Sequence, residues 1–273
     1  MGNKSKNKKG SYRKYSQRKS ASNKDKRFNL KQILESIYVD HVSLETTCKH
    51  LCECCNVAMP QINYCEFVQI ITELWMTRNN AEKIDMILKS IEYFFRYNYE
   101  KWATDSLIKP CMLLDGETKL CTIYENRPLN CRMYGLWPKE DYENRVDKFE
   151  KVYAQYGLKK ENLPLNKQCP FVKRVDNSKP ITTEVINELF AKLDALDKKV
   201  GSFTDLQVSQ KENYRTFHDW LLLKALGEEW LTRLTGFIMA ADRDVLEDQL
   251  EAIKDVFRAE FLKSGIPDVT RRL

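Results

Sequence analysis

The sequence predicts an all-α protein, in which a helical body carries irregular cysteine-rich loops and follows a disordered basic N-terminal tail. Three observations predict this organisation. Apolar residues recur at helical spacing through most of the 273-residue chain, with no βαβ alternation and no internal repeat. Seven of the nine cysteines fall in two short, polar, turn-rich segments. Lysine and arginine crowd the first positions of the chain.

The tail comprises residues 1–27 and holds eleven Lys or Arg against a single acid. The formal charge of +6 belongs to this tail, because the other residues include 34 basic and 38 acidic side chains. Its only large side chains are Tyr12 and Tyr15, so it cannot bury enough apolar surface to offset the entropy of ordering. We expect it either to contact the phosphates of RNA or DNA or to act only as a solubilising extension. The cations considered for a nucleic-acid contact are Lys8, Lys9, Arg13, Lys14, Arg18 and Lys19.

The body shows helical periodicity in segments that are separated by turn signals. Pro60 breaks the chain before one segment, Asn79 or Asn80 offers a helix cap, and Gly265 with Pro267 stops the last helix. The apolar stripes, including the aromatic run near residue 95 and Cys65, are expected to form core. The predicted helices cover about residues 28–42, 62–76, 80–102, 136–157, 181–200, 212–226, 228–240 and 242–264.

Two cysteine segments carry the chemistry. The first, CKHLCECC, begins directly after the first predicted helix, and the second spans residues 111–132, where three cysteines are separated by nine residues each. Thiolates are soft ligands that suit zinc and iron-sulfur clusters, and either needs about four ligands at short range. We therefore expect the two segments to be halves of one metal site, against the alternative of reduced core thiols. The candidate ligands are Cys48, Cys52, Cys54, Cys55, Cys111, Cys121, Cys131 and Cys169.

A radical enzyme is a weaker interpretation of the first segment. Cys48, Cys52 and Cys55 satisfy C-x3-C-x2-C, the spacing that radical S-adenosylmethionine enzymes use. Such enzymes place that spacing after the first strand of a partial βα barrel, and the sequence predicts no such strand. His50 lies within the segment, but a lone histidine among so many thiols is a weak ligand candidate.

The residues from Cys121 to Arg132 carry a family resemblance. They read C-x-IY-x-x-RP-x-x-CR and, with Cys111 and the first segment, resemble the CxxCxxCC or YkgJ-type cysteine-cluster family over about residues 45–172. One residue, Glu53, stands where the family usually has two before the paired cysteines, so either Cys54 or Cys55 could face a metal. The resemblance implies a zinc ion or an iron-sulfur cluster. Similar patterns occur in flagellin lysine methylases, so it does not specify a reaction.

Four residues of this motif are expected to support the site: Tyr124, Arg127, Pro128 and Arg132. The arginines can donate hydrogen bonds to a thiolate-rich site or offset its negative charge, and Pro128 fixes the turn between them. The alternative is that both arginines pair with surface acids.

The chain is expected to divide into the tail of residues 1–27, a cysteine-cluster metal-binding domain of residues 28–175 and a C-terminal helical region of residues 176–273. An odd cysteine count, an adjacent cysteine pair and the lack of an apolar leader favour a reducing, cytoplasmic location. No apolar run is long enough for a transmembrane helix.

These observations favour a cytoplasmic metal-binding accessory or interaction protein, whose basic arm contacts nucleic acid and whose body has a protein partner. The alternative is an enzyme, either an iron-sulfur redox protein or a lysine-N-methylase-like modifier. The sequence leaves open whether the protein is an enzyme.

Overall fold

The computed structural model describes residues 30–39, 44–46, 53–57, 59–103, 110–155, 157–159, 172–201 and 214–270. The predictions for the tail of residues 1–27, and for Cys48, Cys52 and Cys169, lie outside these ranges. Within the described ranges the protein is predominantly helical, and its single sheet has two strands of three residues. The all-α prediction is therefore confirmed for the part of the chain that is described.

The helices follow the predicted order, and their ends differ from prediction by a few residues. Asn79 caps α4 as expected, because its side-chain oxygen accepts the Glu82 N–H at 3.0 Å. No helix among the described residues is both long and apolar enough to cross a membrane. Besides an unlabelled helix at 30–39, the elements are α2 (Glu53–Val57), β1 (Gln61–Asn63), α3 (Tyr64–Thr77), α4 (Asn80–Ala103), η1 (Tyr124–Asn126), α5 (Leu129–Arg132), α6 (Lys139–Ala154), α7 (Thr183–Gly201), β2 (Tyr214–Thr216), α8 (Phe217–Leu226), α9 (Glu228–Ala240) and α10 (Arg243–Ser264).

Two predicted helices start too early, because their first residues form the strand pair. β1 and β2 are antiparallel, with Ile62 opposite Arg215 and Asn63 opposite Tyr214. Each strand runs straight into a helix, α3 or α8, and the cap residues Asn63 and Thr216 keep extended backbone angles. The sequence pattern did not reveal this pairing, because strands of three residues are too short to show a period of two.

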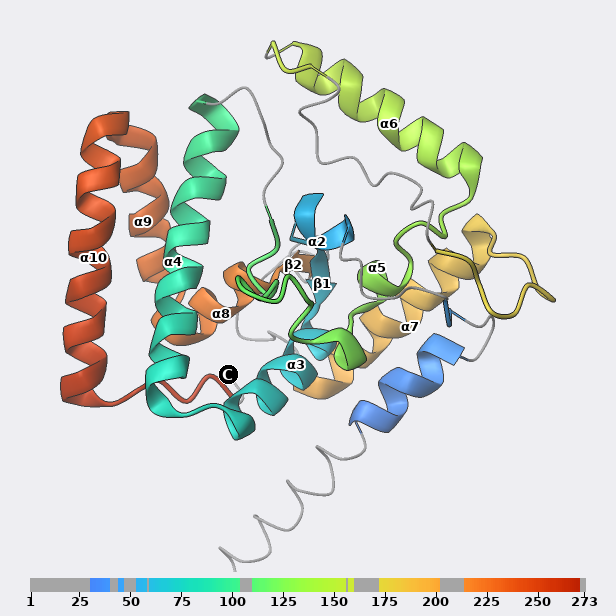
Figure 1. Ribbon diagram of the computed structural model, residues 1–273, viewed down its shortest axis with the longest axis horizontal. Helices are drawn as coiled ribbons and strands as arrows, with labels where there is room; N and C mark the ends of the chain where they lie inside the picture. Colours follow the sequence, from blue (N-terminus) through green and yellow to red (C-terminus); the bar gives the residue numbers. More distant parts are fainter. Residues whose placement is uncertain are drawn as a thin grey trace, which may run out of the picture.

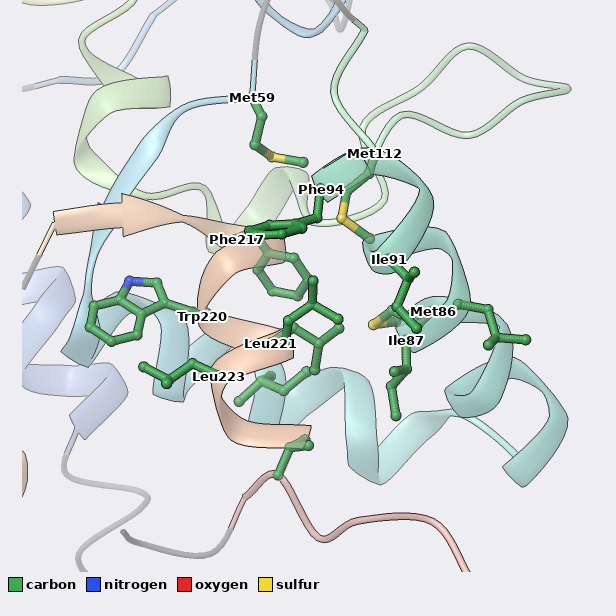
Figure 2. Packing of buried hydrophobic residues seen from close by; sticks show 14 of the residues in the cluster. Met59, Met86, Ile87, Ile91, Phe94, Met112, Phe217, Trp220, Leu221 and Leu223 are labelled. Atoms are coloured by element: carbon green, nitrogen blue, oxygen red, sulfur yellow. The ribbon is translucent and has the colours of Figure 1, made fainter. Parts of the chain in front are cut away.

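Two hydrophobic clusters share α3, whose place among the other helices is shown in Figure 1. The larger cluster joins α3, α4, α8, α9 and α10, and Figure 2 shows Phe217 and Leu221 of α8 facing Ile91 of α4. The smaller cluster joins helix 30–39, α3, α5 and α7. Helices from before and after residue 175 therefore contribute to both clusters. Fully buried members include Ile62, Cys65, Phe67, Ile87, Ile91, Leu129, Met133, Leu189, Leu193, Phe217, Trp220 and Leu221.

A buried carboxylate connects α3 to two other elements. Glu66 is 2% exposed, and its oxygens accept hydrogen bonds from the Tyr38 hydroxyl at 2.7 Å, the Asn63 N–H at 3.0 Å and the Leu129 N–H at 2.6 Å. Burial raises the pKa of Glu66, and the three donors oppose that rise. Helix 30–39, the start of α3 and the first residue of α5 therefore meet at one side chain.

A second acid fixes α7 against the same end of α3. Asp197 accepts hydrogen bonds from the Cys65 N–H at 2.7 Å and from the Asn63 side-chain amide at 3.0 Å. Negative charge at a helix N-terminus is favourable, because the first N–H groups have no partner within the helix. Both acids therefore stabilise the start of α3.

We expect Glu66→Gln to lower the free energy of unfolding by about 3 kcal/mol. The amide has only one oxygen to accept the three buried hydrogen bonds, and its NH₂ group would face N–H or O–H groups that are themselves donors. Chemical denaturation followed by circular dichroism measures this loss. Glu82→Gln is the matched control, because Glu82 also accepts a backbone N–H at a helix start, from Asn79 at 2.7 Å, but is exposed. It should change the stability by less than about 0.5 kcal/mol. Equal effects of the two substitutions would contradict the role given to Glu66.

Candidate metal centre

The two cysteine segments meet in the structure. Cys54 and Cys55 lie on α2, and the Cys55 carbonyl accepts a hydrogen bond from the Cys111 N–H at 2.5 Å. The Sγ atoms of Cys54 and Cys55 are 3.9 Å apart. A backbone contact therefore joins the described end of the first segment to the start of the second.

A hairpin-like turn brings Cys121 back toward Cys111. Leu114 and Cys121 form an antiparallel bridge, and the Thr122 N–H donates to the Leu113 carbonyl at 2.9 Å. At the tip, the Asp115 carboxylate accepts the Thr118 N–H at 2.7 Å, which closes the turn. The turn thus brings Cys121 back beside the residues that follow Cys111. Nine residues between two cysteines would otherwise be a long spacing for two metal ligands in one loop.

The short helix α5 carries Cys131. Pro128 precedes it with φ of −66°, and the Pro128 carbonyl accepts the N–H groups of Cys131 at 3.0 Å and Arg132 at 3.1 Å. The first N–H of α5, that of Leu129, donates to Glu66. Four residues could not form a stable helix in isolation, so these fixed ends hold Cys131 in place.

All five of these cysteines line one cavity of about 490 Å³. Cys55 and Cys111 are buried, whereas Cys54, Cys121 and Cys131 are partly exposed. The Cys111 thiol also lies 3.4 Å from the Met59 sulfur, which lines the same cavity. The structure therefore gathers five of the eight predicted ligands, and the other three lie outside the described residues.

The thiols divide into two kinds by acidity. Hydrogen bonding to Cys111, Cys121 and Cys54 raises the pKa of Cys55, which favours its protonated form. Hydrogen bonding from Cys55 lowers the pKa of Cys54, and it lowers that of Cys121 to about 7 with help from the Ile123 backbone. Desolvation and the nearby thiolates raise the pKa of Cys131. Cys54 and Cys121 are therefore the two described thiols of this cavity whose pKa values are lowered.

The two arginines of the motif lie differently. Arg127 stacks on the Tyr124 ring at 3.7 Å, donates to the Tyr124 carbonyl at 3.0 Å, and its charge lowers the pKa values of Cys54, Cys121 and Cys131. Arg132 instead forms an ion pair with Glu35 at 3.0 Å and lies over the Tyr38 ring at 4.5 Å. Arg127 thus offsets thiolate charge, whereas Arg132 fastens α5 to helix 30–39.

The donor set fits a soft cation. Among the described residues, no three His, Cys, Asp or Glu side chains are arranged so that they could hold a metal ion. Five thiols nevertheless face one cavity, two have lowered pKa values and an arginine stands beside them. Thiolates of this kind favour zinc or iron. To coordinate a metal, these five thiols must either move closer together or be joined by one or more of Cys48, Cys52 and Cys169.

Cys65 and His218 lie outside this cavity lining. Cys65 is fully buried in the smaller cluster, with its thiol 3.8 Å from the Leu193 carbonyl, as expected for a core cysteine. His218 is buried, contacts the Tyr93 and Tyr97 rings at centroid distances of 6.2 and 5.8 Å, and has Nε2 3.2 Å from the Thr216 hydroxyl. Burial lowers the pKa of His218, so it packs as a neutral ring.

A thiol-lined cavity at the meeting point of two cysteine segments defines a cysteine-cluster domain. The CxxCxxCC family model, described as "Putative zinc- or iron-chelating domain", matches residues 47–170. Residues 47–170 thus match the model of that family, and the resemblance read from the motif is confirmed. The description supports a metal-binding role at the level of zinc or iron. No curated protein and no solved structure matches the chain.

Some lining residues were not anticipated from the sequence. Tyr97 belongs to the aromatic run that was expected to be core, yet it faces the cavity. Asn130 donates to the Gln61 carbonyl at 2.6 Å and to the Tyr214 hydroxyl, linking α5 to the strand pair. Asn130 occupies a variable position of the motif and carries no signal by itself. Helix α6 also lines the cavity, through residues that include Tyr142, Val146, Phe149 and Tyr153. These residues recur every three or four positions, a spacing from which the sequence could have revealed this face of the helix.

In the reduced, metal-free protein we expect Arg127→Gln to raise the pKa of Cys121 above about 7, since a neighbouring positive charge is lost. The midpoint of its alkylation by iodoacetamide should move to higher pH, with a rate at pH 7 about two- to fivefold lower, because the thiolate is the reactive form. Peptide mapping by mass spectrometry measures the rate. Arg132→Gln should leave the Cys121 profile in place, because Arg132 pairs with Glu35. A shifted profile in both variants would argue against a specific effect of Arg127.

Proposed function

We propose that this protein binds one zinc ion or iron-sulfur cluster through a thiolate site built from both cysteine segments. The observation that carries this proposal is the convergence of Cys54 and Cys55 with three cysteines from residues 111–131 on one cavity. More than fifty residues separate the segments, and closing so long a loop has an entropic cost. Buried thiols that serve only as core would not need to gather in this way.

We propose that about four thiolates hold the metal. They are drawn from Cys54, Cys55, Cys111, Cys121 and Cys131 together with Cys48, Cys52 and Cys169. Tyr124 and Pro128 position the loop, Arg127 balances its charge and Arg132 anchors it. Zinc would act structurally by closing the loops, whereas an iron-sulfur cluster would add electron transfer. A brown protein with visible charge-transfer absorbance after anaerobic purification indicates the cluster, and a colourless protein with stoichiometric zinc indicates the ion.

We further propose a cytoplasmic accessory or interaction role. The basic tail of residues 1–27 then serves as an arm for RNA or DNA, since its cations can neutralise phosphates and its tyrosines can stack on bases. A protein partner for the body belongs to the same proposal. Reduced thiols in such number suit a reducing compartment.

An enzyme is the second candidate, and the cavity is the observation that favours it. About 490 Å³ is the size of a small-molecule site, and this cavity opens directly onto the thiols. A cluster at that position would lie beside a bound substrate, as a redox enzyme or a lysine-N-methylase-like modifier requires. Turnover that is lost together with the metal would support this candidate.

Cys131→Ser tests whether the two segments form one unit. We expect the variant to lose most of its metal, to show faster hydrogen exchange in residues 44–58 and to melt at a much lower temperature. Thiolate coordination can supply on the order of 10 kcal/mol of folding free energy, so losing a ligand should loosen both segments. Elemental analysis and hydrogen-exchange mass spectrometry measure these effects.

The matched control is Cys65→Ser, in a buried position outside the cavity lining. It should keep its metal and lose only about 1–2 kcal/mol of stability from burying a hydroxyl. Full metal content in Cys131→Ser, or a disturbance confined to the loop around Cys131, would contradict the single site. The protein would then have two independent sites or none.

Deleting residues 1–27 tests the proposed arm. The truncated protein should keep its metal and helicity, bind RNA and DNA more weakly and show a flatter dependence of log affinity on log salt. If the six named cations all contact phosphates, the slope should fall by about 4 to 5. Exchanging Lys for Arg and Arg for Lys at those six positions keeps the charge and should keep the slope. An unchanged affinity and slope after deletion would make the tail a solubilising extension only.

A further inference from the structure

The thiol cavity has a second wall that metal binding does not use. Helix α6 contributes Tyr142, Arg145, Val146, Phe149 and Tyr153, which lie three or four residues apart and so share one face. Figure 1 shows α6 along one side of the molecule, beyond α2 and α5. Trp137, just before α6, extends this wall.

This wall is aromatic and incompletely packed. The Phe149 and Tyr153 rings stack at 5.6 Å with 20° between their planes, yet Phe149 stays 43% exposed. The apolar cluster around α6 has only Val146 and Leu158 as buried members among the described residues, with the partly buried Tyr142 and Tyr153 against them, and Tyr142 also packs against the smaller main cluster. An apolar stripe of this kind gains free energy when a ligand covers it.

One charge decides what kind of ligand fits. Among the described residues that line the cavity, Arg145 is the only Lys, Arg, Asp or Glu. Its guanidinium lies over the Trp137 ring at 4.0 Å, and it forms no ion pair with an acid in the described part of the chain. An aromatic wall alone could attract a cation to its ring faces. Here the arginine already covers the Trp137 face and would repel a second cation, so an anion is favoured.

We propose that this cavity binds a small molecule with a flat apolar body and one anionic group, a carboxylate, sulfonate or phosphate. The body lies against the rings of Phe149 and Tyr153, and the anionic group pairs with Arg145, which Trp137 holds in place. A volume of about 490 Å³ accommodates such a molecule beside the thiols. This site goes beyond the proposed metal site and does not depend on which metal is bound.

A pair of fluorescent probes tests this proposal on the full-length protein as purified. Anilinonaphthalenesulfonate has an aromatic body and a sulfonate, and N-phenylnaphthylamine has the same rings without the charge. The wild type should bind the anionic probe at one site. Arg145→Gln should weaken the anionic probe about three- to tenfold and leave the Kd of the neutral probe within about twofold. Phe149→Ala should weaken both probes.

Arg233→Gln is the matched control, because Arg233 also lies over a tryptophan, Trp230 at 5.7 Å, but outside the cavity lining. It should leave both Kd values unchanged. Equal losses in Arg145→Gln and Arg233→Gln, or probe binding that Phe149→Ala does not affect, would overturn the proposal. Metal analysis of every variant separates the two proposals: loss of metal in Cys131→Ser concerns the metal site, whereas a loss of probe at full metal content concerns the ligand site.

Discussion

The structure depends most on the carboxylate of Glu66. It collects donors from helix 30–39, from the cap of α3 and from the first residue of α5, three elements that are far apart in sequence. Burying a carboxylate costs free energy unless its oxygens accept hydrogen bonds. Moving any of these elements away would leave a buried oxygen of Glu66 without a donor, so the carboxylate opposes their separation. Because α5 carries Cys131, the buried carboxylate of Glu66 helps to fix the position of the Cys131 thiol.

Different contacts position the different parts of the thiol site. Glu66 and the apolar clusters hold α3 and α5 together through protein contacts, and the Cys55 carbonyl fixes the start of the loop at Cys111. In the proposed metal-bound protein, thiolate coordination would add to these contacts and hold the two segments together more firmly than the protein contacts alone.

Much of the helical body could be predicted, because long amphipathic stripes such as α7 and α10 carry a strong periodic signal. The meeting of the two cysteine segments followed from ligand chemistry, and five of the eight thiols do lie together. Glu66 could not be foreseen, since a single acid in an apolar helix looks like a solvent-facing residue until its three donors are known. The strand pair and the aromatic cavity depend on contacts between distant residues, which no local pattern encodes. The division into three regions stays a prediction.

The two arginines explain why the motif combines these residue types within twelve positions. Arg127 must stand close to the thiols, since Coulomb effects weaken with distance, and stacking on Tyr124 at 3.7 Å keeps it there. Arg132 follows Cys131 directly on α5 and reaches Glu35 and Tyr38 on helix 30–39. Tyr38 in turn donates to Glu66. One short stretch of sequence thus tunes the charge of the thiols and ties them, through Arg132, Tyr38 and Glu66, to the core that positions them.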